Sequence, residues 1–352
     1  MPKRVAIVLF NLGGPDGPDA VQPFLFNLFN DKAIIRAPGP VRWGIAKLIS
    51  KTRAPSAKEN YAKMGGGSPL LPETRKQADA LEKAVAETYG FEAKCFIAMR
   101  YWRPFTEDAV RAVKDWGADE IVLLPLYPQF STTTTGSSLD AWREAGGDEA
   151  RAICCYPTER NLIEAHAEAL LSTWRVAGEP DNVRVLLSAH GLPERVVKDG
   201  DPYQWQVEQS VDAVAQALPG DWDVEVCYQS RVGPLTWIGP STEDAIERAA
   251  QDGKKILLSP IAFVSEHIET LVELDEEYKE YAEDKGVETY LRAPALGVAE
   301  AFISGLADLV GQALANAPGL QSHAGGRICP KDWGACRNVS AFVDIEAMEP
   351  AE

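Results

Sequence analysis

The sequence predicts an α/β protein built from two doubly wound lobes with parallel sheets. Short β-branched runs alternate with helical stretches along the chain, which is typical of βαβ units with parallel strands. The alternation starts again near residue 184, so the chain divides into two halves of similar organisation. Three strand ends in the first half also resemble three in the second, which indicates an internal duplication.

The predicted strands lie three in each half and are joined by amphipathic helices. They span residues 5–10, 94–99, 121–126, 184–188, 223–228 and 255–259. Helices are predicted between them, for example at 106–116 and 242–251. Ligands of open parallel sheets bind beyond the carboxyl ends of the strands, so we expect both sets of strand ends to face one cleft between the lobes.

The boundaries expected from this pattern are a first lobe at 1–160, a second lobe at 161–320 and a cysteine-containing tail at 321–352. The first lobe contains an insertion at about 24–68, here called the lip. The lip is rich in apolar and basic side chains: Arg42, Trp43, Ile45, Lys47, Leu48, Ile49, Lys51 and Arg53. Such a surface suits anionic lipid or a greasy ligand, and an ordinary amphipathic helix packed on the core fits it equally well.

Composition excludes several classes of function. The formal net charge of −17 repels nucleic-acid phosphate, so nucleic acid is not an expected partner. No apolar run approaches the ~20 residues that a membrane-spanning helix needs, and no signal peptide is recognised. Six cysteines without a secretory leader indicate a reducing compartment, and a cytoplasmic location is expected.

The glycine-rich runs do not match nucleotide-binding loops. Gly13-Gly14-Pro15 follows the first strand, but no G-x-G-x-x-G is present and Pro15 is a poor residue for a pyrophosphate cradle. Gly65-Gly-Gly-Ser-Pro69 lacks the lysine of a phosphate loop. Nicotinamide chemistry is therefore disfavoured.

His190 is the strongest of the four histidines as a candidate catalytic residue. It ends an apolar strand, and the Gly-Leu-Pro that follows forces the chain to turn at the edge of the cleft. An imidazole there can accept a proton or bind a divalent metal. A structural histidine is the alternative, and His166 and His323 are both expected to be solvated.

Residues 265–278 predict a helix that carries a stripe of carboxylates. Ser265 is the expected N-cap, and glutamates recur at three- and four-residue steps: Glu266, Glu269, Glu273 and Glu276 or Glu277. Crowded carboxylates share protons and attract divalent metals, although on an exposed helix such a stripe is usually a solvated face. Its start beside His267, just after a strand, favours a function at the cleft.

These segments together resemble the ferrochelatase family, in order from residue 5 to about residue 315. The matching motifs are Asn11-Leu-Gly-Gly-Pro15, Gly65-Gly-Gly-Ser-Pro69, Arg100-Tyr101, Leu126-Tyr-Pro-Gln-Phe-Ser131 with Thr134-Thr-Gly-Ser-Ser138, Ser188-Ala-His-Gly-Leu-Pro193, Val232-Gly-Pro-Leu-Thr-Trp237 and Pro260-Ile-Ala-Phe-Val-Ser-Glu-His-Ile-Glu-Thr-Leu271. The resemblance, to the bacterial type, implies two Rossmann-like lobes of the class II chelatase kind around a porphyrin cleft. It implies insertion of Fe²⁺ into protoporphyrin IX with release of two protons, the last step of haem synthesis, and no cofactor for the chemistry.

The resemblance also implies roles for individual residues. His190 and Glu269 match the pair that faces the porphyrin nitrogens from opposite sides, and which of them takes a proton and which delivers metal stays open. Glu266, His267 and Glu273 match a line of polar residues behind Glu269. The expected substrate-binding residues are Leu12, Arg100, Tyr101, Tyr127 and Trp237. Leu12 stands where some relatives have Met or Tyr, so only a packing role is expected of it.

Some ferrochelatases carry a [2Fe-2S] cluster, and four cysteines of this chain are candidate ligands: Cys154, Cys155, Cys329 and Cys336. The tail offers fewer cysteines than cluster-containing members usually have, and Thr132 stands where animal enzymes have a ligand. Free thiols or a surface disulfide are equally compatible with the sequence.

Two alternatives to a protoporphyrin ferrochelatase stay open. One is a chelatase for another tetrapyrrole, such as coproporphyrin III with iron or a corrin precursor with cobalt. The other is a non-catalytic haem- or metal-binding protein, which the combination of His190 with the glutamate stripe disfavours. Transient contact with the inner face of the cell membrane and with a porphyrin-donating enzyme is expected, and the oligomeric state is left open.

Overall fold

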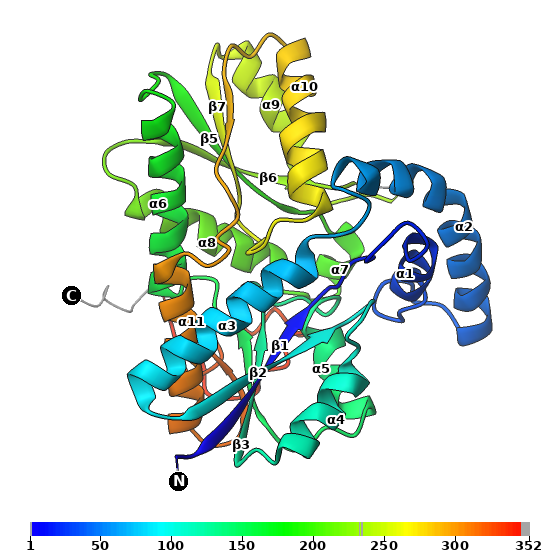
Figure 1. Cartoon of the computed structure of the whole chain (residues 1–352). Coiled ribbons are helices and arrows are strands. Elements are labelled where there is room, and N and C mark those ends of the chain that lie inside the picture. Colours follow the sequence, from blue (N-terminus) through cyan, green and yellow to red (C-terminus); the bar gives the residue numbers. More distant parts are fainter. Residues whose placement is uncertain (1, 232, 234, 346–352) are drawn as a thin grey trace.

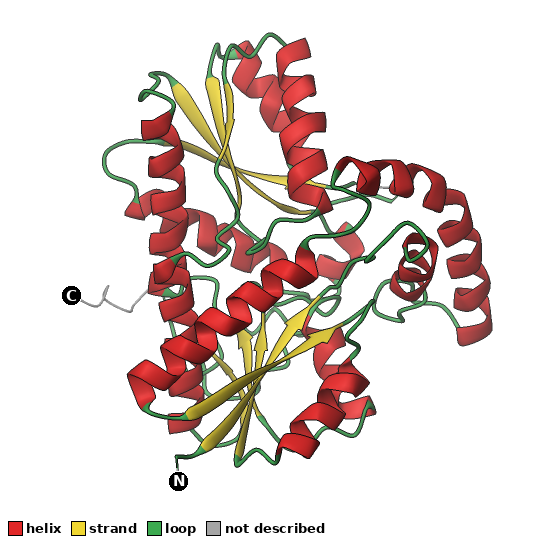
Figure 2. Cartoon of the chain, viewed as in Figure 1, coloured by secondary structure: helices red, strands yellow, loops and turns green. Residues whose placement is uncertain are grey.

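The computed structural model describes residues 2–231, 233 and 235–345, and consists of two α/β lobes, one above the other in Figures 1 and 2. Every strand pair in both lobes is parallel. The sheet of the first lobe has the order β2-β1-β3-β4-β9, and that of the second has the order β6-β5-β7-β8. The predicted fold class is confirmed.

The six predicted strands are all present, together with three shorter ones. The strands are β1 (Arg4–Asn11), β2 (Glu92–Met99), β3 (Glu120–Pro125), β4 (Arg151–Cys155), β5 (Val183–His190), β6 (Asp223–Gln229), β7 (Lys255–Pro260), β8 (Tyr290–Arg292) and β9 (Gly319–Ser322). The helices are α1 (Val21–Phe29), α2 (Gly39–Lys63), α3 (Leu70–Tyr89), α4 (Thr106–Trp116), α5 (Thr135–Glu144), α6 (Arg160–Val176), α7 (Glu194–Lys198), α8 (Tyr203–Ala217), α9 (Thr242–Gln251), η1 (Glu269–Glu277), α10 (Tyr278–Asp284) and α11 (Glu300–Ala315).

The central strand β1 shows why its sequence is apolar throughout. Successive side chains of a strand point to opposite faces, and helices cover both faces of a doubly wound sheet. Val5 and Leu9 accordingly join a core that includes α3 and α11, whereas Val8 and Phe10 join the core beneath α4 on the other face. A strand buried on both faces needs apolar side chains at every position.

The internal duplication is visible in the topology. Strands β2-β1-β3 occupy the same places in the first sheet as β6-β5-β7 in the second. A short parallel bridge follows the second strand in each lobe, between Met99 and Phe105 and between Tyr228 and Ser241. The equivalent strand ends found in the sequence therefore lie at equivalent places of the two lobes.

The chain returns to the first lobe earlier than the predicted boundary at 320. Helix α11 packs against α3 and α6, and its Phe302, Leu306 and Val310 share a core with the first sheet. Strand β9 pairs with β4 at the edge of that sheet, and the last strand of the second lobe ends at Arg292. The sequence did not reveal this return, because an apolar helix face fits the sheet of either lobe.

The lip forms the helices α1 and α2, which pack on each other at the side of the first lobe (Figure 1). Lys63, the last residue of α2, forms a 2.5 Å ion pair with Glu276 of the second lobe. Gly65 and Gly66 follow with positive φ angles of 86° and 95°, which L side chains rarely adopt, so the chain can turn sharply after the helix. None of the helices in the described part of the chain is long and apolar enough to cross a membrane.

Two histidines that were expected to be solvated are buried or half-buried. His166 on α6 is 1% exposed, and neither of its ring nitrogens has a hydrogen-bond partner among the described residues. Burial lowers its pKa to about 4, so the ring is neutral. His323 is half-buried, and its Nε2 lies 3.0 Å from the Thr158 hydroxyl. The hydrophilic sequence around each residue concealed its packing against neighbouring elements.

Candidate active site

His190 is the last residue of β5 and is held at a sharp turn. A Cβ on the next residue, Gly191, would lie 2.9 Å from the carbonyl oxygen of Gln229, so the close approach requires glycine there. The Nδ1 atom of His190 lies 2.6 Å from the Gly191 carbonyl oxygen. A carbonyl only accepts, so in the neutral ring Nδ1 carries the proton and Nε2 keeps a free lone pair.

The predicted carboxylate helix is a π-helix, η1, that continues into the α-helix α10. Ser265 is not its N-cap, because the Ser265 hydroxyl donates to the side chain of Gln77. In a π-helix, hydrogen bonds join residues five apart, and single π turns are frequent at functional sites. Side-chain spacing alone did not distinguish this helix from an α-helix.

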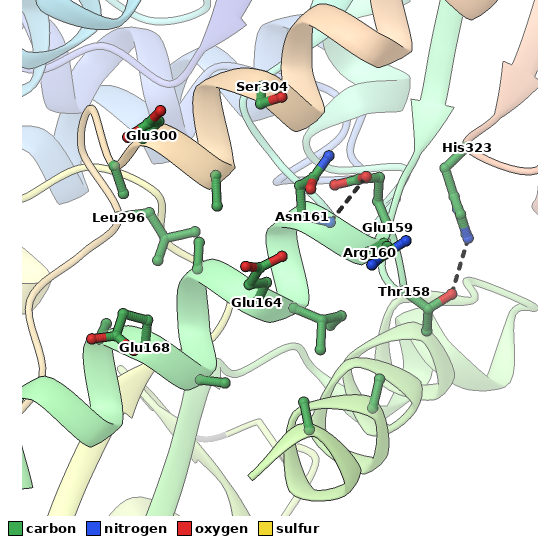
Figure 3. A pocket seen from close by; sticks show the side chains of 18 of the residues that line it. Thr158, Glu159, Arg160, Asn161, Glu164, Glu168, Leu296, Glu300, Ser304 and His323 are labelled. Atoms are coloured by element: carbon green, nitrogen blue, oxygen red, sulfur yellow. Dashed lines mark hydrogen bonds between the residues drawn. The ribbon is translucent and has the colours of Figure 1, made fainter. Parts of the chain in front are cut away.

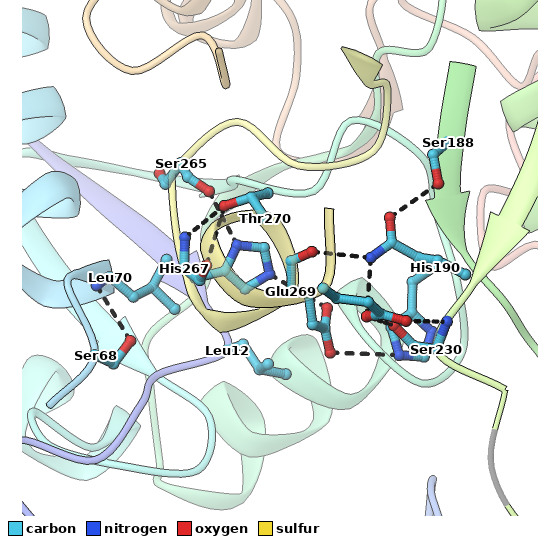
Figure 4. A network of polar contacts seen from close by, with 12 residues as sticks. Leu12, Ser68, Leu70, Ser188, His190, Ser230, Ser265, His267, Glu269 and Thr270 are labelled. Atoms are coloured by element: carbon cyan, nitrogen blue, oxygen red, sulfur yellow. Dashed lines mark hydrogen bonds and ion pairs between the residues drawn. The ribbon is translucent and has the colours of Figure 1, made fainter. Parts of the chain in front are cut away.

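Glu269 lies between two histidines at the start of η1 (Figure 4). Its Oε1 is 3.6 Å from His190 Nε2, and its Oε2 is 3.2 Å from His267 Nε2. Burial alone would raise the pKa of Glu269, but His190 and the hydrogen bond from His267 outweigh it and hold that pKa at about 2. Glu269 is therefore an anion, placed to stabilise positive charge on His190.

Glu273 lies one four-residue step further along η1 and is held by several donors. The backbone N–H of Ser230 donates to it at 2.8 Å and the Ser230 hydroxyl at 2.5 Å. Gln229 Nε2 and the Tyr278 hydroxyl each donate at 3.1 Å. Burial and the nearby charge of Glu269 nevertheless raise the pKa of Glu273. Two neighbouring carboxyls with pKa values displaced in opposite directions are suited to hold and pass a proton.

The other glutamates of the stripe face elsewhere. Glu266 forms a 2.5 Å ion pair with Arg292 and accepts the Ala295 N–H at 2.9 Å. Glu276 pairs with Lys63 of the lip. Glu269 contacts both His190 and His267, and Glu273 lies close enough to Glu269 and His190 for their charges to shift its pKa. A relay role for Glu266 stays a prediction that its own contacts do not favour.

Leu12 lies in the loop after β1, and Trp237 lies in the loop after β6. A Cβ added to Gly191 would lie 3.3 Å from the Trp237 ring, so this indole packs on the turn that carries His190. Leu12 follows β1 and is half-buried, and it is drawn in the close-up of the Glu269 network (Figure 4). Val232 and Pro234 of the motif that contains Trp237 lie outside the described residues.

Arg100 and Tyr101 belong to a polar network around a buried carboxylate, Asp31. Asp31 pairs with Arg100 at 2.9 Å and accepts the Tyr101 hydroxyl at 2.8 Å. Tyr127 is not part of this network: its buried hydroxyl has no hydrogen-bond partner among the described residues. Tyr101 is 1% exposed, and burial raises the pKa of both tyrosines. The Asp31 contacts join the first sheet to the segment of the lip that follows α1, and contact of Arg100, Tyr101 and Tyr127 with substrate stays a prediction.

The four candidate cluster cysteines are buried together between β4 and the C-terminal segment. Cys154 Sγ and Cys155 Sγ are 3.3 Å apart, and Gln206 donates to Cys329 Sγ at 3.1 Å. Hydrogen bonds from Cys155 and Cys336 lower the pKa of Cys329. All six cysteines of the chain are described, and all six are free.

A large hollow of the described residues lies away from these side chains. A groove of about 1690 Å³ runs between α6, α8 and α11, and Figure 3 shows Glu164, Leu296 and His323 among its lining. His190 and Glu269 do not line it. The candidate active site is therefore assigned from the chemistry of its side chains and not from the size of a cavity.

Sequence reasoning did not assign several residues that contact the site. Gln229 and Ser230 hold Glu273, and Tyr278 donates to the same carboxylate. Tyr61 of α2 is buried, and burial raises its pKa. The nearby charge of Glu269 raises the pKa of Tyr61 further. The available signal was that Gln229 and Ser230 end the strand next to β5 in an internally duplicated segment.

Comparisons with known proteins agree over nearly the whole chain. A family model described as ferrochelatase matches residues 4–314. Curated ferrochelatases from Hyphomonas neptunium and Caulobacter vibrioides are each 60% identical over 339 residues, covering 96% of this chain and 95% and 98% of theirs. A ferrochelatase from Rickettsia bellii is 47% identical over 346 residues, covering 97% of this chain and 96% of its own.

Among solved structures, a similar fold occurs in the sirohydrochlorin chelatase SirB from Bacillus subtilis subspecies spizizenii, in complex with cobalt. Its TM-score is 0.51 at 11% sequence identity, and the match covers 89% of this chain and 96% of that one. At this identity the likeness concerns the fold alone, and it agrees with two parallel sheets of the chelatase kind.

Proposed function

The chain belongs to the ferrochelatase family, and we propose that His190 and Glu269 form the centre at which this metal chelatase inserts Fe²⁺ into protoporphyrin IX. The observation that carries the proposal is the imidazole of His190 facing an ionised carboxylate at the carboxyl end of β5. The products are protohaem and two protons. No resident cofactor takes part in the chemistry.

In this mechanism His190 accepts a pyrrole proton. Its Nδ1 is engaged by the Gly191 carbonyl, so Nε2 provides the lone pair. The imidazolium formed is 3.6 Å from the Glu269 carboxylate, which stabilises it. Burial strengthens this interaction, because the partly desolvated site has a lower dielectric than water.

Glu269 and Glu273 serve the metal and the departing protons. Fe²⁺ favours anionic oxygen ligands once water is stripped from it, and Glu269 is ionised. Glu273, with its raised pKa, is suited to hold a proton that leaves the centre. Both carboxylates lie on η1, which begins at Glu269 and leads away from His190.

An anaerobic insertion assay with Fe²⁺ and protoporphyrin IX tests the proposal. We expect the porphyrin absorption to change to that of the metal complex, and competition with coproporphyrin III should leave protoporphyrin IX the preferred substrate. If the protein bound porphyrin without inserting metal, it would be a non-catalytic binding protein. If it preferred coproporphyrin III, the proposed substrate would be wrong, but the proposed centre would still stand.

We also propose that the lip brings the protein to the membrane surface on its cytoplasmic face. Its helix α2 exposes Trp43 by 53% and Leu48 by 65% of their surfaces. Lys47 and Lys51 are exposed beside them and can attract anionic headgroups, at ~1 kcal/mol each. Arg42, by contrast, donates to backbone carbonyls of the lip and is held in place. Protoporphyrin IX is poorly soluble in water, so such contact would deliver it directly.

Replacing Trp43 and Leu48 with Ser, and Lys47 and Lys51 with Glu, should release the protein from anionic vesicles. The apparent KM for vesicle-borne porphyrin should rise, while turnover of detergent-solubilised porphyrin should change little. Flotation with vesicles that contain anionic lipid measures the binding.

A control with the same chemistry uses exposed residues outside the lip: Val176→Ser, Val339→Ser, Lys76→Glu and Lys83→Glu. This control should bind vesicles as the parent does. If both variants were released equally, the effect would come from net charge and not from the lip. If the lip variant bound vesicles as the parent does, the lip would not be a membrane contact and would serve only as a lid of the cleft.

The four clustered thiols are proposed as the ligands of a [2Fe-2S] cluster. Within the described residues no three His, Cys, Asp or Glu side chains form a ready-made site for a metal ion. The donor set nevertheless supplies the four cysteine sulfurs that such a cluster needs, buried in one place. A cluster would supply one-electron chemistry, which metal insertion does not use.

Protein purified without oxygen should contain about two non-substrate iron atoms and two sulfides per chain and absorb in the visible range. Cys329→Ser should remove this absorption, whereas Cys95→Ser, outside the group, should keep it. Colourless, iron-free parent protein would establish the four cysteines as a reduced thiol group.

A further inference from the structure

One buried side chain contacts both halves of the proposed centre. Gln229, the last residue of β6, is 0% exposed and lies beside His190 in the β5–β6 ladder. Its backbone carbonyl accepts the Gly191 N–H at 2.8 Å, which fixes the turn that carries His190. Its side chain reaches η1, where its Nε2 donates to residues 269 and 273.

The amide of Gln229 joins two points of η1. Its Nε2 donates to the Glu269 carbonyl oxygen and to Glu273 Oε2, each at 3.1 Å. These acceptors are four residues apart on the same helix, so one planar NH₂ group restrains the rotation of η1 about its axis. The direction in which both carboxylates point depends on that rotation.

The orientation of the amide is itself fixed. The Ser188 hydroxyl donates to Gln229 Oε1 at 2.9 Å, so the oxygen must face Ser188 and the nitrogen must face η1. Ser188 is buried and precedes His190 by two residues on the same strand. A flipped amide would place its oxygen against two groups of η1 that only accept, the Glu269 carbonyl and the Glu273 carboxylate.

The residue after Gln229 adds to the restraint. Ser230 has a φ of 62°, a left-handed conformation that residues with a side chain rarely adopt. This conformation lets both its N–H and its hydroxyl donate to Glu273. The end of β6 therefore presents three donors to one carboxylate.

We propose that Gln229, oriented by Ser188, is a positioning residue that holds Glu269 and Glu273 in line with His190. This role rests on the proposed function, because it acts through carboxylates assigned there to the metal and proton path. Gln229 need not touch substrate. Its contribution is to keep η1 in one rotational setting, so that an incoming metal ion meets preorganised oxygens.

Gln229→Leu should raise the apparent KM for the metal ion and lower kcat, because it removes the donor to Glu273 and the clamp on η1. The loss of a hydrogen bond to a charged group corresponds to a combined change in kcat/KM for metal of about 10- to 100-fold. The KM for porphyrin should be unchanged. Steady-state assays that vary Zn²⁺, Fe²⁺ and protoporphyrin IX separately give these constants. A merely structural lesion would lower the active fraction without raising the KM for metal alone.

A double-mutant cycle with Glu273→Gln tests whether Gln229 acts through that carboxylate. If it does, adding Gln229→Leu to Glu273→Gln should cost much less than it costs in the parent protein. Ser188→Ala should reproduce part of the effect, and Ser188→Thr, which keeps a hydroxyl, should restore it. Additive losses would contradict the proposal.

Gln77 provides a matched control. It is also 0% exposed, it also donates to two backbone carbonyls, Val264 and Gly297, and it also accepts from a serine. Gln77→Leu should reduce thermal stability by a similar amount and leave the KM for metal near the parent value. If Glu273→Gln alone has no effect on metal kinetics, the carboxylate path of the proposed function fails. If it has an effect that Gln229→Leu lacks, the role of Gln229 fails.

Discussion

Replacing His190 with alanine is expected to lower kcat for metal insertion by about 100- to 10,000-fold, the range in which positioned acid–base groups contribute. The residue ends β5, and its Nε2, which keeps a free lone pair, faces Glu269. Its side chain is 36% exposed, so truncation leaves no closed cavity in the core. The melting temperature should therefore change little.

A second histidine serves as the control for this substitution. His323 is half-buried in the groove between α6, α8 and α11 and contacts Thr158. His323→Ala should keep parent-like turnover. Insertion rates under anaerobic conditions, together with thermal unfolding of both variants, make the comparison. Parent-like turnover by His190→Ala would remove this histidine from the mechanism.

The fold was predictable because its signals are local and repeated. Each strand of the first sheet that was predicted, such as β1, is an apolar run between polar loops, and burial on both faces requires that pattern. The apolar run of β5 and the Gly-Leu-Pro that follows it predicted His190 at a strand end, where the structure has it. The sequence did not reveal that α11 packs on the first lobe, because the apolar face of a helix carries no information about which sheet it covers.

The sequence singled out the two residues of the proposed centre but not the residues that hold them. His190 and Glu269 are unusual residue types at informative places in the sequence. Gln229, in contrast, is an ordinary polar residue whose importance comes from three contacts to segments distant in sequence. The π-helix was also hidden, because the recurrence of glutamates fits an α-helix equally well. Contacts that depend on tertiary packing produce no periodic pattern in the sequence.

The glutamate stripe illustrates the same limit. Sequence spacing treated Glu266, Glu269 and Glu273 as one line, but Arg292 pairs with Glu266 and draws it toward β8. A lone arginine on a short strand gives no sequence signal of that partner. Charge pairing across the fold thus decides which carboxylates can face the cleft.

Glu269→Gln is expected to lower insertion by about 100- to 10,000-fold, whereas Glu277→Gln should stay within about twofold of the parent. The two substitutions remove the same charge from the two ends of η1. Glu269 is enclosed with His190 and His267, and its pKa of about 2 means that the anion is present throughout any working pH range. Glu277 is exposed, where solvent screens its charge.

The pH dependence of these variants adds a second criterion. A glutamate whose pKa is lowered from 4.5 to about 2 is fully ionised above its unfolded value, so the loss in Glu269→Gln should be constant from about pH 6 upward. Insertion rates measured for both variants across that range, with folding checked by thermal unfolding, provide the test. Small and equal losses would mean that η1 carries only a solvated acidic face, because a glutamate that stabilises the His190 imidazolium cannot be neutralised without slowing the step in which that charge forms.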